Sequence, residues 1–291
     1  TVWGALLQSN GHHMLSWSED KTLRLWNMTN GECLRVFGGH ENVVWGVLLT
    51  PDDRRALSWS EDTTLRLWNL EGGECLRVFK GHEKTIWGAL LTPSGCHALS
   101  WSGDQTLRLW DLESGECLRV FEGHKDTVLG VQLTPDGCHA LSWSEDKTFR
   151  LWNLENGMCL RVFEGHEDSV RGLYMASTGC RVFSWSWDKT FRLWDMQNGK
   201  CLHEFKGHER GVEGVLPVLD DHCALSWSSD DTLRLWDIES GKCLCVEYLS
   251  SLPSSALTCS RSKKRIVYGT VSGQLSFLSP VNIPNCLISM E

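Results

Sequence analysis

The stretch Ala56-Leu-Ser-Trp-Ser-Glu-Asp-Thr-Thr-Leu-Arg-Leu-Trp68 decides the fold, because the chain repeats it almost verbatim. Its final tryptophan recurs every 42 positions, at Trp26, Trp68, Trp110, Trp152, Trp194 and Trp236. A Gly-His pair keeps the same step, at 39–40, 81–82, 123–124, 165–166 and 207–208. A period of this length is typical of solenoids and propellers. The unit to explain is therefore one repeat, and we expect function where the repeats differ.

One repeat contains four predicted strands. In the second repeat we expect them at 44–49, 55–60, 64–68 and 74–79, separated by turns rich in Gly, Pro, Asp and Asn. Apolar residues show no helical period, which indicates an all-β chain. A single four-stranded sheet cannot bury both of its faces, whereas sheets stacked around an axis can, and that arrangement is a propeller.

The number of repeats predicts the size of the propeller. Six repeats are clear, and a seventh is weaker but in phase, with strands expected at 265–270, 274–278 and 285–290. Seven repeats would need 294 residues, and the chain has 291. We therefore predict one domain over residues 1–291, a seven-bladed β-propeller of four-stranded antiparallel blades. Its blades are expected at approximately 1–38, 39–80, 81–122, 123–164, 165–206, 207–248 and 249–291.

The motifs resemble those of a known family. The Gly-His pair, the Ser-x-Ser-x-Asp turn and the Leu-Trp-Asp ending of Leu109–Asp111 recur together at fixed offsets. Together they resemble the WD40-repeat β-propellers, in particular the tandem repeats of bacterial proteins, over essentially the whole chain. The resemblance implies a buried hydrogen-bonded set in each complete repeat, running from His to Asp with contacts from Ser and Trp. The matching residues are His40, Ser58, Asp62, Trp68; His82, Ser100, Asp104, Trp110; His124, Ser142, Asp146, Trp152; His166, Ser184, Asp188, Trp194; and His208, Ser226, Asp230, Trp236.

The Ser, His and Asp of each repeat also allow a catalytic-triad interpretation. A nucleophile acts from one exposed cleft, whereas this grouping recurs five times inside predicted strands. A buried set of hydrogen bonds explains the recurrence better. We therefore predict that the chain is not an enzyme, and we assign no catalytic residue.

Composition limits the classes of partner. The net charge of −9 argues against nucleic acid, which needs a basic surface. No run of 18 or more apolar residues could span a membrane, and no leader opens the chain. The chain begins within a repeat, without its Gly-His pair, so we expect either a monomeric ring or part of a larger chain.

Nine of the 13 cysteines follow the repeat. Six share one offset at the start of the predicted fourth strand, and Cys96, Cys138 and Cys180 share another. No close Cys-x2-Cys pair of the kind that binds zinc occurs. We therefore predict thiols packed in the core as small hydrophobic groups, no metal and no cofactor. Unpaired thiols favour a reducing cytoplasm.

A second tryptophan lies inside each Ser-Trp-Ser segment, as in Trp59, where the family usually has a small residue. Strand alternation places Trp59 on the same face as Leu57. We expect these indoles to fill the space between blades. An aromatic ligand slot is the alternative.

The position five residues after each Gly-His histidine varies most. It holds Trp3, Trp45, Trp87, Leu129, Arg171 and Glu213. The resemblance implies that this position lies near one mouth of a central channel, where related propellers bind peptides. A half-aromatic, half-charged rim suits a cationic side chain or a peptide with an aromatic anchor. Alternatively, the three tryptophans only plug the channel.

The residue before the turn Asp is implied to face the same mouth. Here it is Glu19, Glu61, Gly103, Glu145, Trp187 and Ser229. The three carboxylates favour a basic partner, and Trp187 is the only aromatic residue of the set.

We predict a non-catalytic scaffold that binds a protein or peptide partner on the channel-mouth face, with a signalling role. The alternative is the ligand-sensing propeller of a larger bacterial signalling or NTPase protein, which the abrupt start of the chain favours. An enzyme built in the channel would need unique catalytic groups there, and only Arg171 and Glu213 offer charges.

Overall fold

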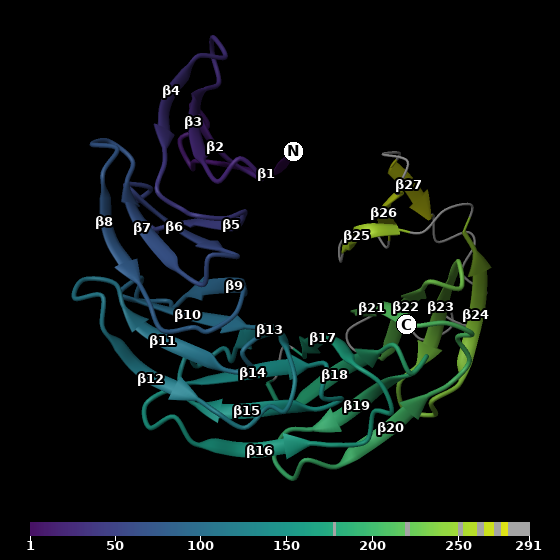
Figure 1. The fold of residues 1–291 in the computed structure, drawn as a ribbon. Coiled ribbons are helices and arrows are strands. Elements are labelled where there is room, and N and C mark those ends of the chain that lie inside the picture. The colour runs from purple at the N-terminus through teal and green to yellow at the C-terminus, as the bar shows by residue number, and fades with distance from the viewer. Residues whose placement is uncertain (177–178, 219–221, 250–252, 261–264, 271–274, 279–291) are drawn as a thin grey trace. The chain divides into compact units, whose positions relative to one another are not determined.

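The computed structural model describes residues 1–176, 179–218, 222–249, 253–260, 265–270 and 275–278. Its regular elements are all β-strands (Figure 1), which confirms the all-β class. In the described residues no helix is long and apolar enough to cross a membrane.

The chain divides into two compact units, one of residues 1–146 and 150–161 and the other of residues 147–149 and 162–291. The strands lying wholly or mostly in the first unit are β1 (Val2–Leu7), β2 (His13–Ser18), β3 (Leu23–Asn27), β4 (Cys33–Phe37), β5 (Val44–Leu49), β6 (Arg55–Ser60), β7 (Leu65–Asn69), β8 (Cys75–Phe79), β9 (Ile86–Leu91), β10 (His97–Ser102), β11 (Leu107–Asp111), β12 (Cys117–Phe121), β13 (Val128–Leu133), β14 (His139–Ser144), β15 (Phe149–Asn153) and β16 (Cys159–Phe163). The strands of the second unit are β17 (Val170–Met175), β18 (Arg181–Ser186), β19 (Phe191–Asp195), β20 (Cys201–Phe205), β21 (Val212–Val218), β22 (Cys223–Ser228), β23 (Thr232–Asp237), β24 (Cys243–Tyr248), β25 (Pro253–Ser260), β26 (Arg265–Thr270) and β27 (Leu275–Leu278).

Each repeat forms one four-stranded sheet whose strands pair in chain order. Six such sheets run from β1–β4 to β21–β24, and β25–β27 form a three-stranded sheet. The strands predicted for the second repeat agree with β5–β8 to within one residue. The closed ring of seven blades stays a prediction, because the fourth strand expected at 285–290 lies outside the described residues.

Consecutive sheets within a unit pack face to face. In the first unit β5 contacts β1 and β2, and β9 contacts β5 and β6. The core between the first two sheets joins Leu15 and Phe37 of one sheet to Val44 and Trp68 of the next. The ring of Phe37 meets the indole of Trp68 edge-on, with centroids 5.8 Å apart. The sheets are therefore held by apolar faces, as the repeat pattern predicts.

Five of the Ser-Trp-Ser tryptophans pack against a hydrophobic core cluster, as predicted: Trp17, Trp59, Trp101, Trp185 and Trp227. Trp59 lies beside the cluster that contains Ile86 and Ala89 of the next sheet. Its indole also covers Gly46, its pairing partner in the neighbouring strand of its own sheet. A Cβ atom built on Gly46 would lie 2.1 Å from Cζ2 of Trp59. Glycine is therefore required here by the close approach of the ring, and the same contact recurs at Gly4, Gly88, Gly130, Gly172 and Gly214.

The prediction that the cysteines pack in the core is wrong for most of the described thiols. Cys96, Cys138 and Cys180 are exposed after the first turn, and Cys117, Cys201 and Cys243 are exposed on the fourth strand. The fourth strand is the outermost strand of each sheet, so few residues cover it. Only Cys223 is buried among the described cysteines.

Candidate functional site

The second repeat shows the geometry of the hydrogen-bonded set. Nδ1 of His40 lies 2.7 Å from Oδ2 of Asp62, and Nε2 lies 2.7 Å from Oγ of Ser58. The indole N–H of Trp68 donates to the same Oγ at 2.8 Å, and the hydroxyl of Thr64 donates to Oδ1 of Asp62 at 2.6 Å. One direction of donation satisfies every group: Trp68 to Ser58, Ser58 to a neutral His40, and His40 to Asp62.

Burial and hydrogen bonding act in opposite directions on these groups. Burial alone would raise the pKa of Asp62, but hydrogen bonds from His40 and Thr64 outweigh it, so the pKa lies well below the ordinary value. In the sixth repeat the same competition lowers the pKa of Asp230 to about 2. Burial lowers the pKa of His208, although Asp230 opposes that shift. In the sixth repeat the pair is therefore a carboxylate that accepts from a neutral imidazole.

The set recurs in the other complete repeats. The His Nδ1–Asp Oδ2 distance is 2.7 Å for His82–Asp104, His124–Asp146 and His166–Asp188, and 2.9 Å for His208–Asp230. The shared hydroxyls belong to Ser100, Ser142, Ser184 and Ser226, which accept from Trp110, Trp152, Trp194 and Trp236. These four hydroxyls and that of Ser58 are buried. A substrate could meet none of them unless the sheets separated, so the geometry fits a structural set.

The residue five positions after each Gly-His histidine is the extra residue of a β-bulge. In β5 the pairing passes from Val44 opposite Ser60 to Gly46 opposite Trp59, which leaves Trp45 without a partner in the ladder. The same skip leaves out Trp3, Trp87, Leu129, Arg171 and Glu213. A bulge re-aims a side chain and frees it from strand pairing. The position that differs between repeats is therefore the one position of the first strand that has no partner in the neighbouring strand.

Three of these bulge residues form an aromatic row in the first unit. The ring centroids of Trp3 and Trp45 are 5.1 Å apart, and those of Trp45 and Trp87 are 5.7 Å apart, with planes tilted by 45° and 43°. Trp3 is 49% exposed and Trp87 is 45% exposed. Rings in direct contact cannot hold a cation between them. A ligand of the tryptophan row would therefore lie over its exposed faces.

The bulge residues of the second unit make different contacts. The guanidinium of Arg171 lies 4.1 Å from the ring centroid of Trp187, which is 45% exposed. Trp187 also covers Gly211, where a Cβ atom would lie 2.6 Å from the indole. The hydroxyl of Ser229 donates to the carboxylate of Glu213. The cation–π pair predicted for a ligand is thus made within the chain at Arg171.

The bulge position and the position before the turn Asp are separate in the repeat but are neighbours in the fold. Trp187 and Ser229 precede a turn Asp, and each contacts the bulge residue of its own sheet. In the third sheet a Cβ atom on Gly103 would lie 3.4 Å from Nε1 of Trp87. The bulge residue and the residue before the turn Asp therefore form one surface in each of these sheets. Trp3, Trp45, Trp87 and Leu129 belong to the first unit, and Arg171, Trp187 and Glu213 belong to the second.

No group of three or more His, Cys, Asp or Glu side chains in the described part of the chain could hold a metal ion.

Comparisons with known proteins agree with the repeat. Five consecutive segments, 31–69, 73–111, 115–153, 157–195 and 199–237, match the family model described as WD domain, G-beta repeat. Among solved structures, the chain is similar to the crystal structure of the computationally designed Ika8 protein. The TM-score is 0.77 at 22% identity, over 96% of this chain and 83% of that one, and shows the fold alone. No curated protein sequence matches the chain.

Proposed function

The chain belongs to the WD40-repeat family, whose members are typically protein-interaction scaffolds, and from this premise we propose that it binds a protein or peptide partner through the tryptophan row. The observation that carries the proposal is the exposure of Trp3 and Trp87 at a position that strand pairing does not fix. Exposed aromatic side chains are enriched where proteins bind one another. We propose a cytoplasmic setting for this interaction.

The partner group that fits the row is an apolar or cationic side chain laid across it. The indole faces offer apolar area and a negative π surface. Glu19 and Glu61 precede the turn Asp in the first and second sheets, beside Trp3 and Trp45 in the repeat order. The contacts in the other sheets support a common surface for the two offsets. A basic partner residue would then meet both indole and carboxylate.

The test exchanges residues between repeats. The fourth sheet carries Leu129 at the bulge, so Trp45→Leu/Trp87→Leu introduces a side chain that this position already accommodates. We expect the variant to fold, with an unchanged circular dichroism spectrum, and to lose partners that the wild type captures from cell extract. Met158→Glu is the matched control, because Met158 is 61% exposed and Glu32, Glu74 and Glu116 occupy the same offset. If the double variant keeps every partner, the row is not the binding surface.

A further inference from the structure

The third strand of each of the first six repeats carries an arginine two positions before its tryptophan, as in Arg66 before Trp68. Cζ of Arg66 lies 6.0 Å from the ring centroid of Trp68. The Nε atoms of Arg66 and Arg108 are buried and have no hydrogen-bond partner. Nη1 of Arg108 donates to Sγ of Cys117 at 3.9 Å. Both arginines are partly exposed, so an outside ligand would meet the outer nitrogens of the guanidinium groups.

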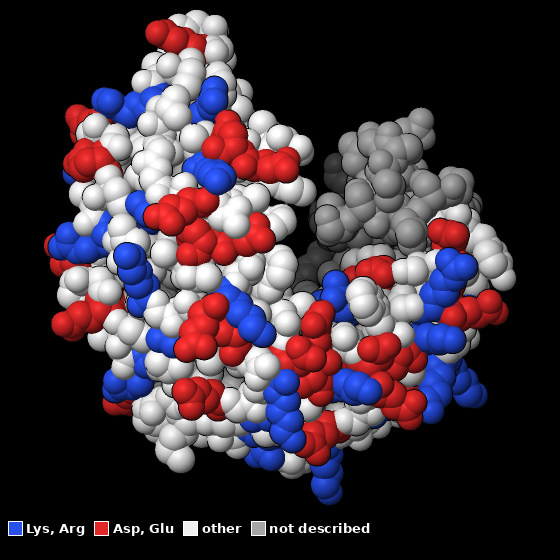
Figure 2. Space-filling model, viewed as in Figure 1, with Lys and Arg blue, Asp and Glu red and all other residues white. Residues whose placement is uncertain are grey.

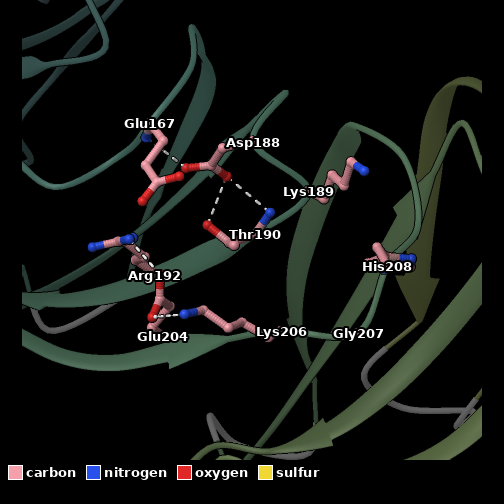
Figure 3. A pocket seen from close by; sticks show the side chains of 9 residues that line it. All are labelled: Glu167, Asp188, Lys189, Thr190, Arg192, Glu204, Lys206, Gly207 and His208. Atoms are coloured by element: carbon pink, nitrogen blue, oxygen red, sulfur yellow. Dashed lines mark hydrogen bonds and ion pairs between the residues drawn. The ribbon is translucent and has the colours of Figure 1, made fainter.

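Two other repeats supply a carboxylate to this arginine. In the first repeat, which has no Gly-His histidine, Nη2 of Arg24 lies 3.3 Å from Oδ2 of Asp20. In the fifth repeat Glu204 pairs with Arg192. Figure 3 shows Glu204 between Arg192 and Lys206, and its Oε2 lies 2.7 Å from Nζ of Lys206. In these two repeats the arginine therefore pairs with a carboxylate of the chain.

The second and third repeats supply no such group. Asp62 and Asp104 are held by His40 and His82. The residues opposite the arginines in the neighbouring strand, where the fifth repeat has Glu204, are valines. These are Val78, which is 38% exposed, and Val120, which is 37% exposed. Each site therefore presents an exposed apolar side chain beside a guanidinium with no ion-pair partner among the described residues.

We propose that Arg66 and Arg108 are docking points for glutamate side chains of an acidic segment in a partner protein. A glutamate combines a methylene stem, which would pack on Val78 or Val120, with a carboxylate, which would pair with the guanidinium. Arginine and carboxylate form short, directional, charge-assisted hydrogen bonds. Each docked glutamate would reproduce the contact that Glu204 makes within the chain.

The charge of the whole chain makes this binding selective. The net charge is −9, and acidic and basic side chains are interspersed on the face of both units seen in Figure 2. An acidic segment would be repelled at long range and held only where cations are locally unneutralised. Binding of an acidic probe would therefore report a specific site, with an affinity that falls as salt rises.

The experiment titrates the wild type into a fluorescein-labelled oligo-glutamate peptide and follows fluorescence anisotropy. We expect saturable binding, with no binding of an oligo-glutamine peptide. Val78→Glu/Val120→Glu copies the fifth repeat and offers each arginine a carboxylate of the chain itself. We expect this variant to lose about tenfold or more in affinity, the equivalent of one charge-assisted hydrogen bond. Glu204→Val, which frees Arg192 and Lys206, should strengthen binding.

Lys200→Glu controls for charge, because it also changes the net charge by two at an exposed offset where Glu32, Glu74 and Glu116 stand. We expect it to change the affinity by less than about twofold, since exposed charges are screened by salt. The proposal is overturned if the oligo-glutamate peptide does not bind, including the case in which inorganic polyphosphate binds and the peptide does not. It is also overturned if Lys200→Glu weakens binding as much as Val78→Glu/Val120→Glu does. Trp45→Leu/Trp87→Leu should bind the probe normally, so this surface and the tryptophan row succeed or fail separately.

Discussion

The first and second repeats share one strand pattern, but only the second has a Gly-His pair before its first strand. Both have the tryptophan–serine hydrogen bond, at 2.8 Å from Trp26 to Ser16 and from Trp68 to Ser58. Only the second has a histidine bonded to its turn aspartate, His40 to Asp62, and this aspartate is 7% exposed, whereas Asp20 of the first repeat is 46% exposed. The tryptophan–serine hydrogen bond therefore forms within a single sheet with or without the histidine. The turn aspartate is buried only in the repeat that has the histidine.

Packing differs in the same direction. Trp68 is 1% exposed because it lies in the core shared with Leu15 and Phe37 of the preceding sheet. Trp26 is only half-buried. The comparison separates two contributions that most repeats combine, a local hydrogen bond and the burial that comes from the neighbouring sheet.

The largest expected effect on stability comes from replacing each of the two tryptophans in a separate variant. Trp68→Ala should lower the free energy of unfolding by about 3–5 kcal/mol, since it empties a buried site. Trp26→Ala should cost about 1–2 kcal/mol, because less apolar surface is lost from the core. Urea denaturation followed by far-UV circular dichroism measures both. Equal losses would show that the neighbouring sheet adds nothing to the local contact.

The next test converts the second repeat toward the first. His40→Ala should cost about 1–3 kcal/mol, because Asp62 loses a buried donor. His12→Ala is the control: His12 is exposed in a turn of the first repeat, and its loss should stay within about 0.5 kcal/mol. Melting temperatures provide the readout. An unchanged melting temperature for His40→Ala would mean that the hydrogen-bonded set does not stabilise the fold.

The smallest expected effect is on the stability of the fold at low pH. The pKa of Asp230 falls from 3.8 to about 2 on folding, so its stabilisation is complete above pH 3.8 and is lost as pH falls toward 2. The pKa of His208 is also lowered from 6.5, so protonation begins to oppose folding below pH 6.5. Asp230→Asn should therefore flatten the loss of stability between pH 3.8 and 2, by about 1–2 kcal/mol.

Asp20→Asn is the matched variant for the acid test, since Asp20 is hydrogen-bonded to Thr22 but has no histidine partner. Its pKa is lowered as well, chiefly by Thr22, at a much more exposed carboxylate. We expect a smaller change in the same pH range. Identical pH profiles for the two variants would contradict a role for the histidine.

The features that sequence predicts best are those contained within one repeat. The strands of the second repeat and the hydrogen-bonded offsets follow from a motif that recurs every 42 residues. The requirement for Gly46 beneath Trp59 was missed, although a glycine stands 13 positions before every tryptophan of this type in the first six repeats. That periodic pair was the available signal.

Features that depend on exposure were harder to predict. The cysteine that begins each fourth strand is followed by a leucine and therefore resembles a core residue, but Cys117, Cys201 and Cys243 are exposed. The bulge at Trp45 leaves a weak trace, a valine and a glycine on either side of a variable residue. The contact between Arg171 and Trp187 joins β17 to the turn after β18, and no local pattern indicates it.

The β-bulge has a consequence for how such a protein can diverge. Because the bulged residue has no partner in the strand ladder, exchanging it alters the surface while the ladder on either side stays intact. The six first-strand bulges are thus positions where mutation can change the exposed surface while the strand pairing is kept. A library of variants that differ only at these residues, one in each sheet, would present different binding surfaces on the same fold.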